Sequence, residues 1–290
     1  MTKFKKYIGS FWRFITFNPS ITIGLTIFTI LVVLAFGVSL FAPANTLLFN
    51  DQATNLPPSL HHLLGTTVLG QDVFWLLTIA IKNSLILGVI ASVVGLVIGV
   101  FFGLIAGYKG GITEKLILLL ADTFIVIPGL PILILLSLLL KEQLSPVLLG
   151  LVIASVTWGM PVREVRSQIL SLREREFTNT ALFSGFKTHS IVSSEYIPHV
   201  FPWILTSFIN RINIAIGLEI ALAVFGLTSL QVPTIGTMVF WVTSYQALLR
   251  GLWWWFLAPV IAVVLIVVSL YVLSIGLLSY LNSGRGRANE

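Results

Sequence analysis

The sequence predicts an all-α polytopic membrane protein with six transmembrane helices, and two observations support this fold class. Hydrophobic residues make up 57% of the 290 residues and charged residues only 10%, whereas soluble domains carry about 25% charged side chains. A soluble chain with so few charges would expose very large apolar patches, which excludes an ordinary soluble enzyme. The apolar residues also gather in six runs, and a helix of roughly 20 such residues crosses a bilayer core.

The first three runs predict spans at residues 20–42, 79–106 and 116–140. Four cations precede the first run and Ala42-Pro43-Ala44 looks like a cleavage site, so this end resembles a signal peptide. Because the run has 23 residues, and the apolar part of a signal peptide has only about 7 to 15, we expect it to remain as a membrane anchor.

The other three runs predict spans at residues 146–162, 200–225 and 256–280. Trp253, Trp254, Trp255 and Phe256 stand at the start of the last span, where aromatic rings favour the membrane interface. We therefore interpret them as an aromatic belt at the outer surface rather than as a substrate site.

Lysine and arginine predict the orientation of the spans. With the N-terminus in the cytoplasm, 13 of the 17 Lys and Arg residues fall on the cytoplasmic side, as the positive-inside rule requires. Both termini are therefore predicted to be cytoplasmic, and the net charge of +6 needs no nucleic-acid partner to explain it. The segments between spans are a cytoplasmic N-terminal segment (1–19), an external loop (43–78), a cytoplasmic loop (163–199) within a five-helix core (79–282), and a cytoplasmic tail (283–290).

Sequence motifs for catalysis are absent. The chain has no HExxH, Gly-x-Ser-x-Gly or GxxxxGK[ST] pattern and no cysteine, so no conventional hydrolase or nucleotide site is predicted. His61-His62 has no carboxylate at ligand spacing, and we do not expect it to bind a metal. The chain is therefore predicted to be no enzyme and to hold no cofactor, so that any ATP must be used by a partner.

The cytoplasmic stretch from Arg163 to His199 is the most informative segment. Its amphipathic pattern predicts a first helix, a turn at Gly185, a short second helix near 191–196 and a stop at Pro198. On the first helix Phe177, Ala181, Leu182 and Phe183 are predicted to expose a compact apolar patch. Such a patch suits a helix that lies in a partner's groove, and a solvated loop held against the membrane face is the alternative.

These residues also carry a resemblance to a known family. SLREREFTNTALFSGF and YIPHVFP, within residues 171–202, resemble the EAA loop of ABC-transporter permeases, specifically the second permease of the dipeptide/oligopeptide/nickel importer family. That family has an acidic-Ala-Ala helix, a glycine and then Leu-Pro; the matching positions are Asn179, Thr180, Ala181, Gly185, Ile197 and Pro198. Asn179 replaces the usual glutamate, and Glu176 is the candidate to substitute for it.

The resemblance covers roughly residues 60 to 262. HLLGTTVLGQDV at 62–73 is similar to the family's HPLGTDxxGRDV segment. Further matches follow in the family's order: Asn83-Ser84-Leu85, Ala106 to Gly111, Asp122 with Pro128, Arg163-x-x-Arg166, and Glu219 with Phe225-Gly226-Leu227. The C-terminal end departs from the pattern, because the family's NxxGDGLRD reads YVLSIGLLS at 271–279.

The resemblance implies a type I ABC importer permease fold with cytoplasmic coupling helices, in a prokaryotic cytoplasmic (inner) membrane. Its expected partners are a homologous second permease, two ATP-binding subunits that hold ATP and Mg, an extracytoplasmic substrate-binding protein and membrane lipid. Di- or oligopeptides are the default substrate; relatives also carry oligosaccharides and nickel or other metal chelates. The residues expected to couple to the ATPase are Arg173, Arg175, Glu176, Asn179, Ala181, Phe183, Gly185 and Pro198.

Charges within the predicted spans give candidates for the translocation path, because a charge at the bilayer centre costs at least a few kcal/mol and must face protein or water. Arg211, with Asn210 and Asn213 beside it, is the first candidate; a buried contact with the partner permease is the alternative. Glu219 and Asp122 are further candidates, but they lie nearer span ends, which favours structural roles. Arg211 and Glu219 stand about 12 Å apart along a helix, so no direct pair is expected.

Two other classes of protein remain as alternatives. A proton-coupled secondary carrier would also place charges within its spans, but it would not need the long inner loop, and the halves show no inverted repeat. An intramembrane enzyme would need paired catalytic residues within the spans, and none converge by spacing.

Overall fold

The computed structural model describes residues 18–140, 143–186 and 188–286, so most of the predicted segment 1–19, Lys187 and the last four residues of the tail lie outside the described residues. The fold class is confirmed: the described elements are helices, and the β-structure among them is one isolated bridge between Thr66 and Asp72. The α-helices are α2 (Pro19–Val32), α3 (Val73–Lys109), α4 (Gly111–Val126), α5 (Gly129–Leu140), α6 (Pro146–Thr157), α7 (Gly159–Arg173), α8 (Glu176–Phe183), α9 (Thr188–Ile191), α10 (Ile197–Val224), α11 (Ile235–Ser244) and α12 (Trp253–Gly286).

Short non-α turns extend three of these helices. A π-helical turn (Val33–Gly37) and a 3₁₀ turn (Val38–Phe41) continue α2, and a π-helical turn (Val192–Tyr196) joins α9 to α10. Four helices are long and apolar enough to cross a membrane, namely Pro19–Phe41, Val73–Lys109, Ser194–Val224 and Trp253–Leu281. Two bent pairs, α4 with α5 and α6 with α7, raise the number to six if each pair is one span.

The bends correct the prediction of unbroken helices at 116–140 and 146–162. The α4–α5 pair bends by 80° at Ile127, whose ψ of 124° is extended, because the residue before a proline, here Pro128, is sterically excluded from the α region. The α6–α7 pair bends by 53° just before Pro161. A proline ring clashes with the carbonyl four residues earlier, which is that of Thr157, the last residue of α6.

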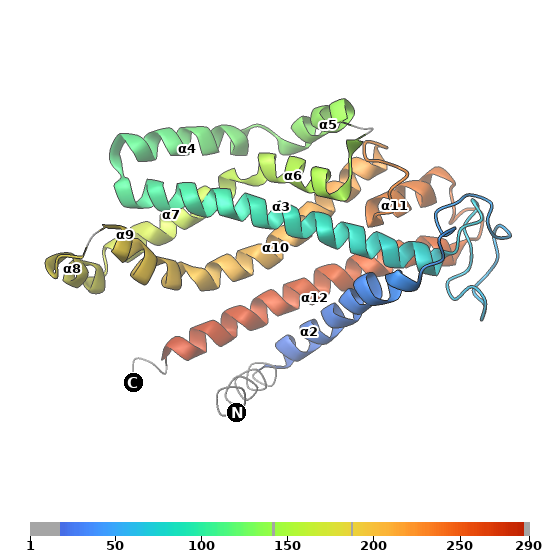
Figure 1. Cartoon of the computed structure of the whole chain (residues 1–290), viewed down its shortest axis with the longest axis horizontal. Helices are drawn as coiled ribbons and strands as arrows, with labels where there is room; N and C mark the ends of the chain where they lie inside the picture. The colour runs from blue at the N-terminus through green and yellow to red at the C-terminus, as the bar shows by residue number, and fades with distance from the viewer. Residues whose placement is uncertain (1–17, 141–142, 187, 287–290) are drawn as a thin grey trace.

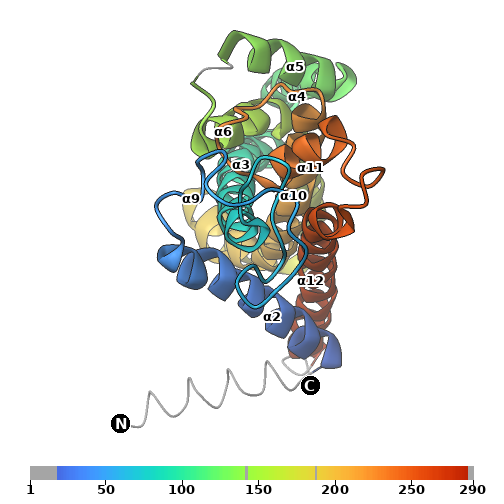
Figure 2. The same cartoon turned by 90° about the vertical axis from the view of Figure 1, so that its right-hand side faces the viewer.

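Helix α3 is the centre of the bundle and packs against α6, α7 and α10 (Figures 1 and 2). Glycines let α7 come close: a Cβ atom at Gly103 would lie 2.6 Å from the Cβ of Val165, and one at Gly107 would lie 2.7 Å from the Cβ of Ile169. Small residues at helix contacts are how membrane helices gain packing, since lipid offers no hydrophobic drive between them. Helix α7 is therefore seated directly on the backbone of α3.

The bundle has two different ends. Helix α8 and the end of α12 lie toward one end, and the loop between α2 and α3 lies at the other, next to α11 (Figure 1). Figure 2 looks at the loop end, where the chain crosses over the start of α3. The helices α8 and α9 of the predicted cytoplasmic loop and the described part of the tail thus lie toward the same end.

The inner loop differs from its prediction at Pro198. Helix α7 runs on to Arg173, α8 follows after a turn, and the chain then continues through α9 and the π-helical turn into α10. Pro198 occupies the first turn of α10, where a missing N–H costs little. The prediction that Pro198 ends a short second helix is therefore wrong.

Candidate functional site

Helix α8 carries four of the eight residues predicted to couple to an ATPase. It ends at Phe183, and the turn after it contains Gly185, whose φ of +78° is left-handed; the N–H of Phe186 donates to the carbonyl of Ala181 at 3.1 Å. A glycine in this conformation is a common helix end because other residues are strained there. Gly185 thus makes the sharp turn that the sequence predicted for it.

The outer surface of α8 is dominated by one aromatic side chain. Phe183 is 91% exposed, and Phe186 is exposed beside it. Arg175 and Glu176 are exposed at the start of the helix, so charged groups and an apolar group both reach solvent here. This combination of an exposed ring and flanking charges is suited to contact with another protein.

The predicted patch of four apolar side chains is wrong in its extent. Phe177 and Ala181 pack against the inner cluster of Val165, Ile169, Leu172, Ile191, Tyr196 and Val200. The ring of Phe177 stacks on His199, with centroids 5.0 Å apart and an angle of 11° between planes. The side chains of Leu182 and Asn179 lie outside the described residues. One face of α8 therefore packs against other helices of the same chain. Of the described apolar side chains here, Phe183 and Phe186 are the exposed ones.

Hydrogen bonds fasten α8 to the helices beneath it. The hydroxyl of buried Thr178 donates to the carbonyl of Leu172 at 2.8 Å, in the last turn of α7. Arg173, predicted to contact the ATPase, donates from Nη1 to the carbonyl of Gly107 at 3.1 Å, near the end of α3. Thr178 thus joins α8 to α7, and Arg173 of α7 joins α7 to α3.

Ion pairs join α7 to α4. The Nε of Arg163 donates to Oδ1 of Asp122 at 2.5 Å, and Arg166 pairs with Glu114. Asp122 therefore lies at the contact between α4 and α7, in keeping with the structural role that its position near a span end favoured.

Glu219 is a fully buried residue of α10, and its side chain lies against the start of α11. Its carboxyl group accepts hydrogen bonds from the Thr234 hydroxyl at 2.5 Å and from the Gly236 N–H at 3.2 Å. The first N–H groups of a helix have no partner within the helix and attract negative charge. The Glu219 side chain supplies this partner, and its carboxyl group takes the space that a Cβ atom at Gly236 would need.

Helix α3 holds the same helix start from its other side. The side-chain amide of Asn83 donates to the carbonyl of Pro233 at 2.7 Å, and the hydroxyl of Ser84 accepts from the N–H of Ile235 at 2.9 Å. Two motifs that the sequence showed more than a hundred residues apart, Asn83-Ser84 and Glu219, therefore meet at the start of α11. Their separate positions in the sequence gave no sign of this convergence.

Arg211 lies beside the α6–α7 bend. Its side chain is only 10% exposed, and Nη1 donates to the carbonyl of Thr157 at 3.1 Å. Because Pro161 denies this carbonyl its helical partner, Arg211 supplies the donor that a broken helix in a membrane requires. Nη2 lies 3.9 Å from Oε2 of Glu164.

Next to Arg211 is a small polar pocket of about 160 Å³, lined by Glu164, Trp203, Thr206, Ser207, Asn210, Arg211 and Ile214. The structure thus brings together the predicted path residues Arg211 and Asn210, whereas Asn213 is not among the lining residues. Sequence reasoning missed Glu164 and Trp203. Glu164 stands between the two arginines of the Arg163-x-x-Arg166 motif, and its contact with α10 was the signal that only the structure provides.

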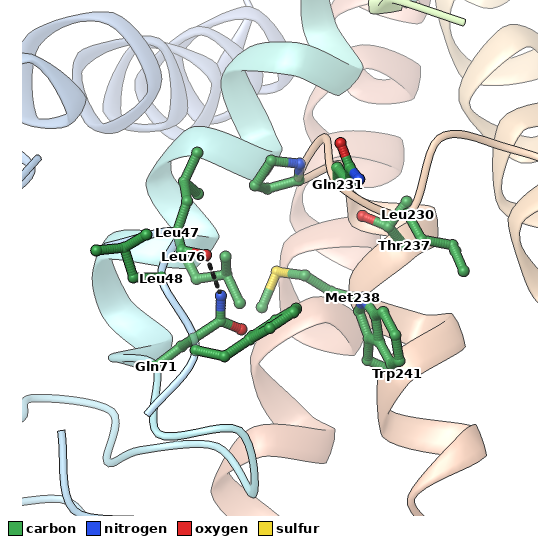
Figure 3. Close-up of a pocket in the computed structure, with 11 residues that line it drawn as sticks. Leu47, Leu48, Gln71, Leu76, Leu230, Gln231, Thr237, Met238 and Trp241 are labelled. Carbon is green, nitrogen blue, oxygen red and sulfur yellow. Dashed lines mark hydrogen bonds between the residues drawn. The ribbon is translucent and has the colours of Figure 1, made fainter. Parts of the chain in front are cut away.

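The outer loop forms a second, larger pocket. It measures about 370 Å³ and lies between the loop, the start of α3 and α11. Figure 3 shows Leu47, Gln71 and Met238 around it, with the side-chain amide of Gln71 donating to the carbonyl of Leu47 at 3.2 Å. The pocket is mainly apolar, with amide groups at its edge.

The loop is fixed by the residues of its predicted motif. Nδ1 of His62 lies 2.8 Å from Oδ2 of Asp72, and Asp72 accepts from the N–H groups of Phe74 and Trp75 to cap α3. Within the described ranges no group of three or more His, Cys, Asp or Glu side chains is placed to hold a metal.

The tryptophans at the start of α12 correct part of the aromatic-belt interpretation. The indole N–H of Trp254 donates to the carbonyl of Thr66 at 3.2 Å, and Trp255 is 1% exposed within the core. Only Trp253 of these three is strongly exposed, so Trp255 faces the protein interior and Trp254 fastens the outer loop.

Known proteins share this sequence pattern. A family model described as the binding-protein-dependent transport system inner membrane component matches residues 99–287. The dipeptide transport system permease protein DppC of Bacillus subtilis (strain 168) is 29% identical over 271 residues, which cover 93% of this chain and 84% of the relative. The oligopeptide transport system permease protein OppC of the same strain is 30% identical over 210 residues, covering 72% and 68%.

OppC of Mycobacterium tuberculosis (strain ATCC 25618 / H37Rv) is 28% identical over 214 residues, covering 73% of this chain and 72% of the relative. The family match includes the last part of α3, both bent pairs, α8, and the charges around Arg211. A transport permease of this kind is an integral inner-membrane protein and not an enzyme. The helical bundle and these matches together place the chain in the binding-protein-dependent transport system inner membrane component family of ABC-transporter permeases.

Proposed function

We propose that this chain is one of two permease subunits of an ATP-driven importer for di- or oligopeptides. Two ATP-binding subunits, which hold ATP and Mg, dock at the α8 end, and an extracytoplasmic binding protein delivers substrate to the loop end. The observation that carries the proposal is an exposed Phe183 on a helix fastened to the transmembrane core, in a member of this permease family. The peptide substrate rests on the names of the relatives, which are dipeptide and oligopeptide permeases.

Coupling follows the contacts of α8. When the ATP-binding subunits close, they push on Phe183 and the charges at Arg175 and Glu176. Because one face of α8 packs on the inner cluster and Thr178 bonds to the end of α7, the push reaches α7 as a rigid displacement. Helix α7 then moves against α4 and α3 and changes the bend at Thr157, which opens or closes the path beside Arg211.

The path itself runs along α10. Arg211 and Asn210 face the polar pocket beside the bend, which is the kind of place where charge is tolerated at membrane depth. Asp122 and Glu219 have partners in α7 and α11, so their roles are to hold helices together. The α8 end, with both termini, faces the cytoplasm.

Co-purification tests the coupling surface. The tagged chain is expressed with its transporter subunits, extracted in mild detergent, and compared with Phe183→Asp and with Gly185→Arg. Loss of the ATP-binding subunits from both variants, with the second permease retained, is the expected result. The matched control is Leu60→Asp, since Leu60 is 96% exposed at the opposite end and its change should leave the ATP-binding subunits and the second permease bound. A wild-type chain that purifies without ATP-binding subunits contradicts the proposal.

Uptake tests the substrate class. Cells that carry the complete importer take up a labelled dipeptide, and unlabelled dipeptide, oligosaccharide or nickel chelate is added in excess. Competition by peptide alone supports the proposal, whereas competition by sugar or chelate moves the substrate to that class.

A further inference from the structure

Glu164 lies in the polar pocket with most of its hydrogen-bonding capacity unused. Its side chain is 43% exposed, and its nearest cation is Arg211 at 3.9 Å, which is beyond the usual length of a charge-assisted hydrogen bond. In the described part of the chain it accepts no hydrogen bond. A carboxylate at membrane depth costs free energy unless it meets protein, water or a ligand.

The pocket is the right size for one small polar group. Its volume of about 160 Å³ has room for a few water molecules, or for one end of a peptide rather than a whole peptide. It opens beside the α6–α7 bend, and Arg211 lies about 21 Å along α10 from the first residue of that helix. The pocket therefore lies beside the middle of α10, although the sequence placed Glu164 two residues beyond the predicted span 146–162, at the start of the predicted cytoplasmic loop.

The chemistry of the walls favours a cation. Arg211 is nearly buried, and its Nη1 donates to the carbonyl of Thr157, whereas its Nε has no hydrogen-bond partner among the described residues. The more exposed charge is the Glu164 carboxylate, and Ser207 and Asn210 add oxygen atoms that can accept hydrogen bonds. The ring of Trp203 forms another wall, and an aromatic face attracts an ammonium ion. An anion in this position would meet Glu164 directly.

We propose that Glu164, with Trp203, Ser207 and Asn210, forms a subsite for a primary ammonium group. This inference rests on the proposed function for the identity of the ligand, which is the free α-amino end of a peptide in transit. Arg211 is a positioning residue that holds the bend and keeps Glu164 next to α10.

Single cysteines test the charge of the pocket. The chain has no cysteine, so Ser207→Cys provides one thiol at the pocket in the assembled importer, whose other subunits are made cysteine-free. Its reaction rates are measured with a cationic and an anionic methanethiosulfonate of similar size. The cationic reagent is expected to react faster, and Glu164→Gln is expected to lower the ratio of the two rates by at least about threefold, because one nearby unit charge is lost.

The matched control is Glu174→Gln, an exposed glutamate on the turn after α7, which should leave the ratio unchanged. If Glu164→Gln fails to assemble, Asn210→Cys with Glu164 intact is measured instead, and a preference for the anionic reagent there overturns the proposal. If the ratio of the cationic to the anionic reaction rate is the same with Glu164 and with Glu164→Gln, the proposed subsite is also overturned.

Protection of the cysteine at position 207 by small ligands tests the ammonium subsite independently of the proposed peptide transport. Glycinamide carries an ammonium group without a carboxylate, and N-acetylglycine carries a carboxylate without an amine. Glycinamide is expected to slow modification of Cys at position 207, and N-acetylglycine is not; protection by N-acetylglycine alone overturns the subsite. If the importer takes up no peptide while glycinamide still protects, the subsite stands and the proposed substrate fails.

Discussion

The three charged residues that the sequence offered as path candidates, Asp122, Arg211 and Glu219, each have a partner from their own chain. Asp122 pairs with Arg163, Arg211 binds the carbonyl of Thr157, and Glu219 binds Thr234 and Gly236. The sequence required such partners, because an isolated charge at the bilayer centre is costly. Which partner each residue has could not be predicted, since Asp122 and Arg163 lie 41 positions apart.

Removal of the Glu219 carboxyl group is expected to destabilise the start of α11. Glu219→Ala leaves the buried Thr234 hydroxyl and the Gly236 N–H without their acceptor, which costs about 1–3 kcal/mol for each buried group left unpaired. The purified chain should therefore melt at a lower temperature than wild type in a thermal-denaturation assay. Glu174→Ala is the control, because Glu174 is exposed; equal melting of both variants and wild type would refute the assigned contact.

At the scale of elements, α7 connects the coupling end to the bend. It packs on α3 through glycines, pairs with α4 through Arg163 and Arg166, and holds α8 through Leu172. Two independent kinds of contact, close packing and ion pairs, thus make α7 a rigid link. The close packing and the ion pairs can each be changed by mutation without altering Phe183.

A larger side chain on the close face of α3 is expected to separate α3 from α7. Gly103→Leu adds atoms where a Cβ alone would lie 2.6 Å from that of Val165, and overpacking of this kind costs about 1–3 kcal/mol. Gly217→Leu is the matched control, since a Cβ atom at Gly217 meets nothing within 4 Å. Thermal denaturation of the two purified variants compares them; a Gly217→Leu variant that melts below Gly103→Leu would contradict this packing.

Exchange of charges between α4 and α7 tests the ion pair of Glu114 and Arg166. Glu114→Arg alone and Arg166→Glu alone each place two like charges together, and both should lower the yield and melting temperature of the purified protein. The double exchange restores opposite charges and should recover most of the loss, because the pair is partly buried and weakly screened. Losses that simply add in the double variant would show that the two residues do not interact.

At the scale of the whole molecule, the two ends of the bundle present different surfaces. The α8 end presents Phe183 to solvent, and the loop end presents the pocket around Gln71 and Met238 (Figures 1 and 3). In the proposed importer these ends face opposite sides of the membrane. The orientation therefore has a direct test.

Cysteine accessibility measures that orientation. Because the chain has no cysteine, Ser59→Cys in the outer loop and Ser184→Cys after α8 each provide one exposed thiol. In intact cells or spheroplasts a membrane-impermeant maleimide should label position 59 and not position 184, and permeabilised cells should label both. The reverse pattern would place α8 outside and remove the basis for ATPase docking there.

The sequence by itself determined the fold class, the six apolar runs and the family, because lipid demands long apolar helices and the motif residues are readable in order. It also predicted the helix that we propose couples to the ATPase, although it overestimated the exposed patch, since Phe177 and Ala181 pack against the protein. Only the tertiary structure decided which distant residues meet: Asn83, Ser84 and Glu219 at α11, and Arg211 with Glu164 at the bend. The physical reason is that apolar helices of similar composition can pack in many ways, and the contacts that select one arrangement lie between residues far apart in the chain.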